Sequence, residues 1–264
     1  MDIQELMGNE NEKPLDRLVN DGGFCGILRT IGCIGDSLSS GEFETYDDTG
    51  KKVYLDCYDY SWGQYIARMA GLKAYNFSRG GMTAKAYCDH FAAEKDFWNP
   101  DLACQAYILA LGANDCHQIA IGSIEDINPD DPTKNADTFA GYYARIIQQY
   151  KQISPNAKFF LMTQPVCKSY DYLNPAWGEQ HTALLYAMAE YFPNCYVIDL
   201  RRYAPVYDEA FREKFFLRGH LNAAGYLLTA RMVVSYIDYI IRHNIADFKE
   251  IGLVGTPYYG NEAK

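Results

Sequence analysis

The stretch of sequence that decides the fold is LRTIGCIGDSLSSG, residues 28–41. It begins with a short apolar run, 28–34, of the length and composition of a buried β-strand. The run ends in Gly35-Asp36-Ser37-Leu38, so a serine stands at the tip of the predicted strand. Gly35 permits a sharp backbone turn, and the Ser37 amide can point towards the oxygen of a carbonyl under attack. Ser37 is therefore a candidate nucleophile, although the same residue types also form ordinary turns.

Four further apolar runs follow along the chain, separated by segments in which apolar residues recur every three or four positions. The runs predict five strands, at 28–34, 73–77, 106–111, 158–162 and 196–200. The helical spacing predicts helices at 61–70, 83–97, 138–152, 175–191 and about 222–244. Such alternation implies parallel strands joined by right-handed crossovers. We therefore expect an α/β protein, a three-layer α/β/α sandwich with a five-stranded parallel sheet.

Three inserts interrupt this alternation, at about 41–60, 117–137 and 164–174. Each follows a strand, so all three should crowd the carboxyl rim of the sheet, where functional groups gather. Long loops at such a rim usually shape a binding site or a lid. The tail after residue 245 is too short to be a domain. We expect one domain over residues 1–264.

Composition narrows the class of protein. A chain of 264 residues that is 48% hydrophobic can bury one sizeable core. Its net charge of -10 gives no electrostatic reason to approach nucleic acid or an anionic membrane. No segment approaches the ~18 apolar residues that span a bilayer, and residues 1–13 are acidic and polar, unlike a signal peptide. We expect a soluble, cytoplasmic protein that binds neither nucleic acid nor membrane. A secreted protein whose leader had been removed would have the same sequence.

The eight cysteines are scattered, with no two closer than eight positions apart, which excludes a Cys-x-x-Cys zinc or redox motif. Their spacing predicts reduced, mostly buried thiols. Four long-range disulfides would also fit the even count. The sequence indicates no metal ion and no organic cofactor.

Two further candidates follow the second and third predicted strands. Gly80-Gly81 lies between a strand and a helix start, where the Gly81 amide could donate to an oxyanion, or where a tight turn could precede a Thr83 cap. Asn114 would project a side-chain amide at the same rim, unless it forms an Asx-turn. Removing one oxyanion donor from a hydrolase costs ~10²-fold or more in rate, so donors at Gly81 and Asn114 would both contribute to catalysis in a hydrolase.

Of the five histidines, only His220 lies in a loop that leads into a final helix, in RGHLNAAGY, residues 218–226. The other four lie in helical or insert contexts, where a histidine is more often structural than catalytic. These four are His90, His117, His181 and His243.

Taken together, these four segments resemble the SGNH, or GDSL, hydrolase family over about residues 28–239. The resemblance implies a flavodoxin-like α/β/α fold, with Ser37 as nucleophile and His220 as general base. It also implies an oxyanion hole formed by the amides of Ser37 and Gly81 and the side chain of Asn114. The reaction would be ester hydrolysis through an acyl-enzyme, without a cofactor.

One position departs from the family pattern. An Asp usually stands three residues before the histidine, and here that position is Leu217. Loss of this acid can cost ~10⁴-fold in a serine hydrolase. We expect a backbone carbonyl near Phe216 or Leu217 to accept the Nδ1–H of His220, giving a Ser-His dyad. A carboxylate within about 3.2 Å of that nitrogen would contradict the dyad. The carboxylates considered as alternatives are Asp199, Asp208, Glu209 and Glu213.

The first and third inserts are rich in aromatic residues, which could stack on sugar faces. They are Phe43, Tyr46, Tyr54, Tyr58, Tyr60, Trp62, Tyr170, Tyr172 and Trp177. This slightly favours a carbohydrate esterase or deacetylase, acting on a sugar ester, over an esterase of short acyl or lipid esters. Core packing explains many of the 23 tyrosines equally well.

Two readings from other classes of protein remain. The alternative that Leu217 motivates is a catalytically impaired glycan-binding protein of the same fold. A nucleotide or flavin binder is disfavoured, because no Gly-x-Gly-x-x-Gly or phosphate-loop pattern follows the first strand. The oligomeric state stays open.

Overall fold

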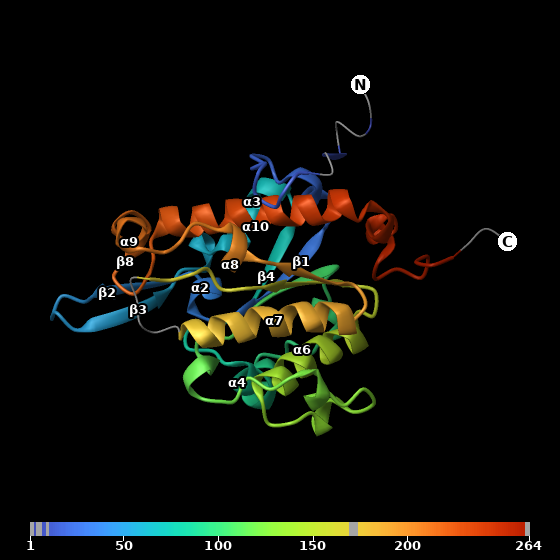
Figure 1. Ribbon diagram of the computed structural model, residues 1–264, viewed down its shortest axis with the longest axis horizontal. Coiled ribbons are helices and arrows are strands. Elements are labelled where there is room, and N and C mark those ends of the chain that lie inside the picture. The colour runs from blue at the N-terminus through green and yellow to red at the C-terminus, as the bar shows by residue number, and fades with distance from the viewer. Residues whose placement is uncertain (1–2, 4–6, 9–10, 169–173, 262–264) are drawn as a thin grey trace.

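The computed structural model describes residues 3, 7–8, 11–168 and 174–261 and is built around a parallel sheet (Figure 1). The strands of this five-stranded sheet are β1 (Thr30–Gly35), β4 (Lys73–Ser78), β5 (Ala106–Ala110), β6 (Lys158–Met162) and β7 (Cys195–Ile198). Their order, β4-β1-β5-β6-β7, is the flavodoxin-like order. Because β4 and β5 flank β1, the loops that follow these three strands are neighbours at one rim.

Helices cover both faces of the sheet, as Figure 1 shows. One face carries α3 (Trp62–Ala70) and α10 (Ala223–His243), and the other carries α6 (Phe139–Ile153), α7 (Pro175–Tyr191) and a broken helix. Each face of the sheet packs against its helices in a separate hydrophobic core, and alternate residues of a strand point into the two cores. In β5, Ile108 packs on the α10 side, while Tyr107 and Leu109 pack on the α6 side. The predicted α/β/α sandwich is confirmed.

The remaining elements are short. The broken helix consists of α4 (Ala84–Ala86), a π-helical turn η3 (Tyr87–Phe91) and α5 (Ala92–Glu94). Three short helices are α2 (Ser37–Ser40), α8 (Leu200–Tyr203) and α9 (Glu209–Phe215). The 3₁₀ turns are η1 (Gly23–Ile27), η2 (Tyr58–Tyr60), η4 (Pro100–Leu102), η5 (Asp115–His117), η6 (Ile124–Asp126), η7 (Pro132–Lys134), η8 (Ile245–Phe248) and η9 (Ile251–Leu253).

Two antiparallel hairpins were not expected from the sequence. The first insert forms β2 (Glu42–Tyr46) and β3 (Lys52–Asp56), and β8 (Phe216–Leu217) pairs with β9 (His220–Leu221). The β2–β3 hairpin projects from the end of the molecule where α9 and β8 lie (Figure 1). Its residues are mostly exposed, so no apolar run marks its strands in the sequence. His220 therefore lies on a short strand rather than in a plain loop.

The predicted strand boundaries hold to within about two residues, and at the fifth strand the structure gives the reason for the difference. β7 ends at Ile198, and Asp199 then accepts a hydrogen bond from the Arg202 amide at 3.1 Å. Leu200, predicted as the end of the strand, is instead the first residue of α8. A capping aspartate stops the strand because it pairs the free amides of a new helix.

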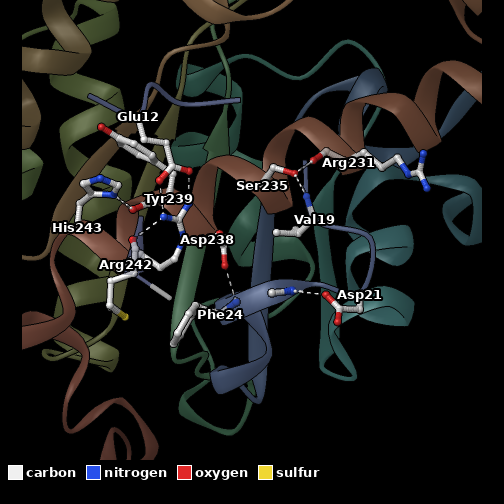
Figure 2. Close-up of polar contacts among 12 residues, drawn as sticks. Glu12, Val19, Asp21, Phe24, Arg231, Ser235, Asp238, Tyr239, Arg242 and His243 are labelled. Carbon is white, nitrogen blue, oxygen red and sulfur yellow. Dashed lines mark hydrogen bonds and ion pairs between the residues drawn. The ribbon is translucent and has the colours of Figure 1, made fainter. Parts of the chain in front are cut away.

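The N-terminal segment is held against α10 by a buried ionic cluster (Figure 2). Arg242 is only 4% exposed, and its guanidinium bonds Asp238 at 2.7 Å and both carboxylate oxygens of Glu12 at 2.7 Å. It also donates to the Met7 carbonyl at 2.6 Å. Asp238 accepts a further bond from the Phe24 amide at 2.8 Å. The cluster therefore ties three separate segments together.

All eight cysteines are free, and five of them are buried, as the spacing predicts. Across the part of the chain that the structure describes, no helix combines the length and apolar character needed to cross a membrane.

Candidate functional site

Ser37 is the first residue of α2, directly beyond the tip of β1. Asp36 caps this one-turn helix by accepting the Leu38 amide at 3.0 Å. A Cβ on Gly35 would lie 2.1 Å from the Ser39 hydroxyl, so only glycine fits the turn. Ser37 itself is half-buried, and its hydroxyl makes no hydrogen bond within the described residues. The local fold thus presents a free serine hydroxyl at the rim.

Asp36 is buried beside this serine. Burial raises the pKa of Asp36 to about 6. A mostly apolar cavity of about 70 Å³ adjoins it, lined also by Leu38, Met162 and Leu221. Ser37 and His220 are not among the residues that line this cavity.

The loops after β4 and β5 flank the end of β1, which carries Ser37, and the two loops contact each other. Gly81 is exposed, with a φ of 71° that favours glycine, and one amide hydrogen of Asn114 donates to the Met82 carbonyl at 3.1 Å. The Arg79 amide reaches the Gly35 carbonyl at 3.4 Å, which joins the end of β4 to the end of β1. The structure therefore brings Ser37, Gly81 and Asn114 to one rim, as the sheet order requires.

His220 reaches the same rim from the far end of the sequence. It lies on β9, which packs against α2. At the start of α10, the Tyr226 hydroxyl donates to the Glu42 carbonyl at 2.7 Å and approaches the Ser37 carbonyl at 3.5 Å. The four predicted site residues are thus gathered together, although no hydrogen bond joins Ser37 to His220 among the described residues.

Two carboxylates from β2 flank the imidazole of His220. Its Nε2 lies 3.1 Å from Glu42 Oε1, and its Nδ1 lies 3.5 Å from Glu44 Oε2. The Tyr54 ring of β3 stands edge-on to the imidazole, with 5.7 Å between ring centroids. Residues two apart on a strand share a face, which is why Glu42 and Glu44 point the same way.

This pair sets the charge of His220. Burial alone would lower the pKa of His220, but Glu42, through its hydrogen bond and its charge, and then the nearby Glu44 carboxylate raise this pKa above its ordinary value. The imidazole is consequently more often protonated at neutral pH than a free histidine.

The acid partners considered from the sequence are elsewhere. Asp199 accepts bonds from Thr163 and Tyr186, and Asp208 caps α9. Glu209 and Glu213 line an open, charged groove beside α9.

The expected backbone carbonyl is not found either, because the buried Nδ1 of His220 makes no hydrogen bond. The sequence reasoning missed Glu42 and Glu44. Their signal is the alternation Glu-x-Glu immediately after the serine turn.

The aromatic candidates divide by exposure. Tyr46, Tyr54 and Tyr60 are about half exposed, at 48%, 52% and 48%. Trp62 and Trp177 are core residues, so core packing, the alternative that the sequence left open, explains these two rings. Phe43 packs against Tyr60 and Tyr226, and Tyr58 is half-buried. Tyr170 and Tyr172 lie outside the described residues.

The remaining histidines keep the structural roles expected of them where the structure gives their contacts. His181 is fully buried, and its Nε2 bonds the Leu111 carbonyl at 3.1 Å. Burial lowers the pKa of His181 to about 4, so it is neutral. His243 bonds the Tyr239 carbonyl at 2.8 Å in the last turn of α10. Among the described residues, no group of three or more His, Cys, Asp or Glu side chains is placed to hold a metal ion.

A flavodoxin-like sheet that carries a serine, a glycine, an asparagine and a histidine at its carboxyl rim defines the class of SGNH-fold hydrolases. The sequence model of the GDSL-like lipase/acylhydrolase family matches residues 33–228, and the chain belongs to this family. Membership supports an ester-hydrolysing enzyme. No curated protein matches the chain.

Solved structures share the fold at low sequence identity. A family two carbohydrate esterase from Clostridium thermocellum, in complex with cellohexaose, is 15% identical with a TM-score of 0.57, over 89% of this chain and 66% of that one. A protein from Lactobacillus plantarum is 15% identical with a TM-score of 0.58, over 80% and 97%. The psychrotrophic esterase EstA from Pseudoalteromonas sp. is 16% identical with a TM-score of 0.51, over 81% and 98%.

Proposed function

We propose that the chain is a serine esterase, with Ser37 as nucleophile and His220 as general base. The observation that carries this is the convergence of Ser37, Gly81, Asn114 and His220 on one rim, in a chain of a family named for acylhydrolases. The amides of Ser37 and Gly81 and the side chain of Asn114 are the donors for the oxyanion. Such donors stabilise the charge that develops on the carbonyl oxygen during attack.

The proposed reaction has two halves. In the first, Ser37 Oγ bonds to the ester carbonyl carbon while its proton passes to Nε2 of His220. The tetrahedral intermediate then expels the alcohol, which takes that proton, and an acyl-enzyme remains. In the second, His220 accepts a proton from water, the hydroxyl attacks the acyl carbon, and Ser37 recovers its proton as the acid leaves.

The substrate that we propose is a carbohydrate ester. Tyr54 supports this, because it is 52% exposed and stands beside the imidazole, where its ring could stack on a sugar face. The carbohydrate esterase of the same fold that was solved with cellohexaose adds support by analogy. Esters of short acyl chains and lipids are the alternatives.

Labelling by a fluorophosphonate tests the nucleophile, because only an activated serine reacts with it. We expect wild type to be labelled at Ser37 and to hydrolyse esters, and Ser37→Ala and His220→Ala to lose both properties. Hydrolysis at near wild-type rates in both variants would refute the mechanism.

A panel of acetylated sugars and p-nitrophenyl esters of rising chain length tests the substrate class. We expect Tyr54→Ala to raise KM for acetylated sugars and to leave KM for p-nitrophenyl acetate unchanged. The control is Tyr258→Ala, which removes a ring that is 67% exposed in the C-terminal segment. A preference for long-chain esters would exclude the carbohydrate ester.

A glycan-binding protein without catalysis is the second candidate. It is favoured by the bond between His220 Nε2 and Glu42, since that nitrogen must be free to take the Ser37 proton. If Ser37 never reacted with the fluorophosphonate and the protein bound an oligosaccharide saturably, the glycan-binding function would be supported.

A further inference from the structure

Glu44 is an unusual residue for an exposed hairpin. Most residues of β2 and β3 are exposed or half-buried, yet Glu44 is only 5% exposed. A carboxylate is rarely buried unless it is paired, and perturbed carboxylates gather at functional sites. Burial alone would raise the pKa of Glu44, but Lys52, the Gly219 amide and His220 lower it below its ordinary value. Glu44 is therefore ionised at neutral pH.

Its neighbours fix the direction of this carboxylate. Lys52 of β3 holds Oε1 at 2.6 Å, and the Gly219 amide donates to Oε2 at 3.1 Å. The same Oε2 lies 3.5 Å from His220 Nδ1. A Cβ on Gly219 would lie 2.4 Å from Oε2, so the absence of a side chain at 219 is what lets Glu44 approach the imidazole.

The two nitrogens of His220 need different partners. In a serine hydrolase Nε2 takes the proton of the serine, while an acid on Nδ1 fixes the tautomer and stabilises the imidazolium. Glu42 on Nε2 competes with Ser37 for that nitrogen, whereas Glu44 on Nδ1 does not. The position of the acid, and not its charge alone, separates the roles of the two glutamates.

We propose that Glu44, carried by β2, is the positioning residue that replaces the acid missing at 217. This rests on the proposed esterase function. The 3.5 Å separation exceeds a hydrogen bond, but catalytic contacts in free enzymes are often long and tighten when substrate binds. Displacing Glu42 from Nε2 would free the ring to move towards Glu44. The acid would then come from the hairpin that follows the serine, not from the β8–β9 hairpin that carries the histidine.

Glu44→Gln tests the proposal, because the amide keeps the shape and removes the charge. We expect kcat at the high-pH plateau to fall by about 10²-fold or more, with KM little changed and the acidic limb of the pH profile at lower pH. Glu42→Gln is the matched variant, two residues away on the same face. It should also move the acidic limb to lower pH, and its kcat at the plateau should fall less than that of Glu44→Gln.

A second-site variant separates positioning from simple loss of structure. Leu217 pairs directly opposite His220 across β8 and β9, where facing side chains are neighbours. In the Glu44→Gln background, Leu217→Asp should therefore restore part of the lost kcat. A plateau kcat of Glu44→Gln within about threefold of wild type, or a larger fall in Glu42→Gln, would overturn the proposal.

Proton NMR keeps the test independent of catalysis. Glu42→Gln, which no longer holds Nε2 by its charge and leaves the ring free to move towards Glu44, should show a downfield Nδ1–H resonance of His220 at low pH. Adding Glu44→Gln to this variant should remove the resonance. If Ser37 of wild type never reacts, the esterase function fails, and this resonance still decides the role of Glu44. Absence of the resonance from Glu42→Gln, or its persistence after Glu44→Gln is added, would overturn the proposal.

Discussion

At the scale of single residues, the site depends on which atom of His220 each neighbour holds. Glu42 bonds the nitrogen that would accept the Ser37 proton in the proposed mechanism, and its second oxygen lies so near Gly80 that a Cβ there would be 2.1 Å away. The Glu42 carboxylate therefore lies between the histidine and the predicted oxyanion loop. In the proposed mechanism an ester would displace this carboxylate, because the two would occupy the same space.

Replacing Glu42 should therefore make Ser37 more reactive at mildly acidic pH. The raised pKa of His220 keeps the imidazole protonated below that pKa, and a protonated base cannot accept the Ser37 proton. Glu42→Gln removes a charge that raises this pKa, so neutral imidazole persists to lower pH. We expect fluorophosphonate labelling at pH 6 to be several-fold faster than in wild type, with similar rates at pH 9. A slower variant at pH 6 would contradict this.

At the scale of elements, the β2–β3 hairpin shapes the site although it lies outside the main sheet. It begins directly after α2, at Gly41, whose φ of 79° turns the chain away from the serine. Tyr226 of α10 then anchors it through the Glu42 carbonyl. This short path from Ser37 explains why an insert can supply groups to His220.

The close packing between this hairpin and β9 gives a second prediction. Gly219→Ala places a methyl carbon 2.4 Å from Glu44 Oε2, which is too close for non-bonded atoms, so the carboxylate must move from its place beside His220. A displacement of about 1 Å near a catalytic group can cost 10²-fold, and we expect a loss of that order in kcat/KM. The control is Gly252→Ala, because a Cβ there meets nothing within 4 Å. Equal activity of the two variants would show that the glycine at 219 is not required.

At the scale of the whole molecule, buried charged groups occur in two places, one that stabilises the fold and one beneath the candidate site. The ionic cluster around Arg242 lies on α10 and holds the N-terminal segment (Figure 2). Buried carboxylates such as Asp36 and Asp115 lie under the rim instead, where desolvation opposes their charge. The Arg242 cluster stabilises the folded state, whereas the buried carboxylates lower its stability at high pH, where they would have to ionise.

Breaking the Arg242 cluster should destabilise the whole protein. Arg242→Met leaves Asp238, which is 2% exposed, without its cation, and such a loss typically costs about 3 to 5 kcal/mol. Chemical denaturation measures the free energy of unfolding. Arg231→Met on the same helix is the control, since Arg231 is exposed and should change stability by less than about 0.5 kcal/mol. Similar values for both variants would contradict a structural role for the cluster.

Asp115 should make stability fall as pH rises. Burial raises its pKa from 3.8 to about 7, so the folded state holds a proton that the unfolded state has lost between these values. Its contribution is full below pH 3.8 and lost as pH passes 7. Asp115→Asn stays neutral and should gain roughly 2 to 4 kcal/mol relative to wild type between pH 4 and pH 8. An unfolding free-energy difference that is independent of pH would contradict this.

The sequence by itself determined the sheet, the helices and the place of Ser37, Gly81 and Asn114, because each follows a strand whose apolar run is local. Parallel strands bring their carboxyl ends to one rim, so these three could be placed together without a structure. The roles of these residues stay predictions.

Only the tertiary structure decided what surrounds His220. Glu44 and Gly219 are 175 positions apart, and their contact depends on how an exposed hairpin packs against β9. Local periodicity carries no information on such packing. The burial of Trp62 and Trp177, and the exposure of Tyr54, were decided in the same way. The exposure of each of these side chains depends on neighbours that are distant in the chain and that come into contact only when the whole sheet has formed.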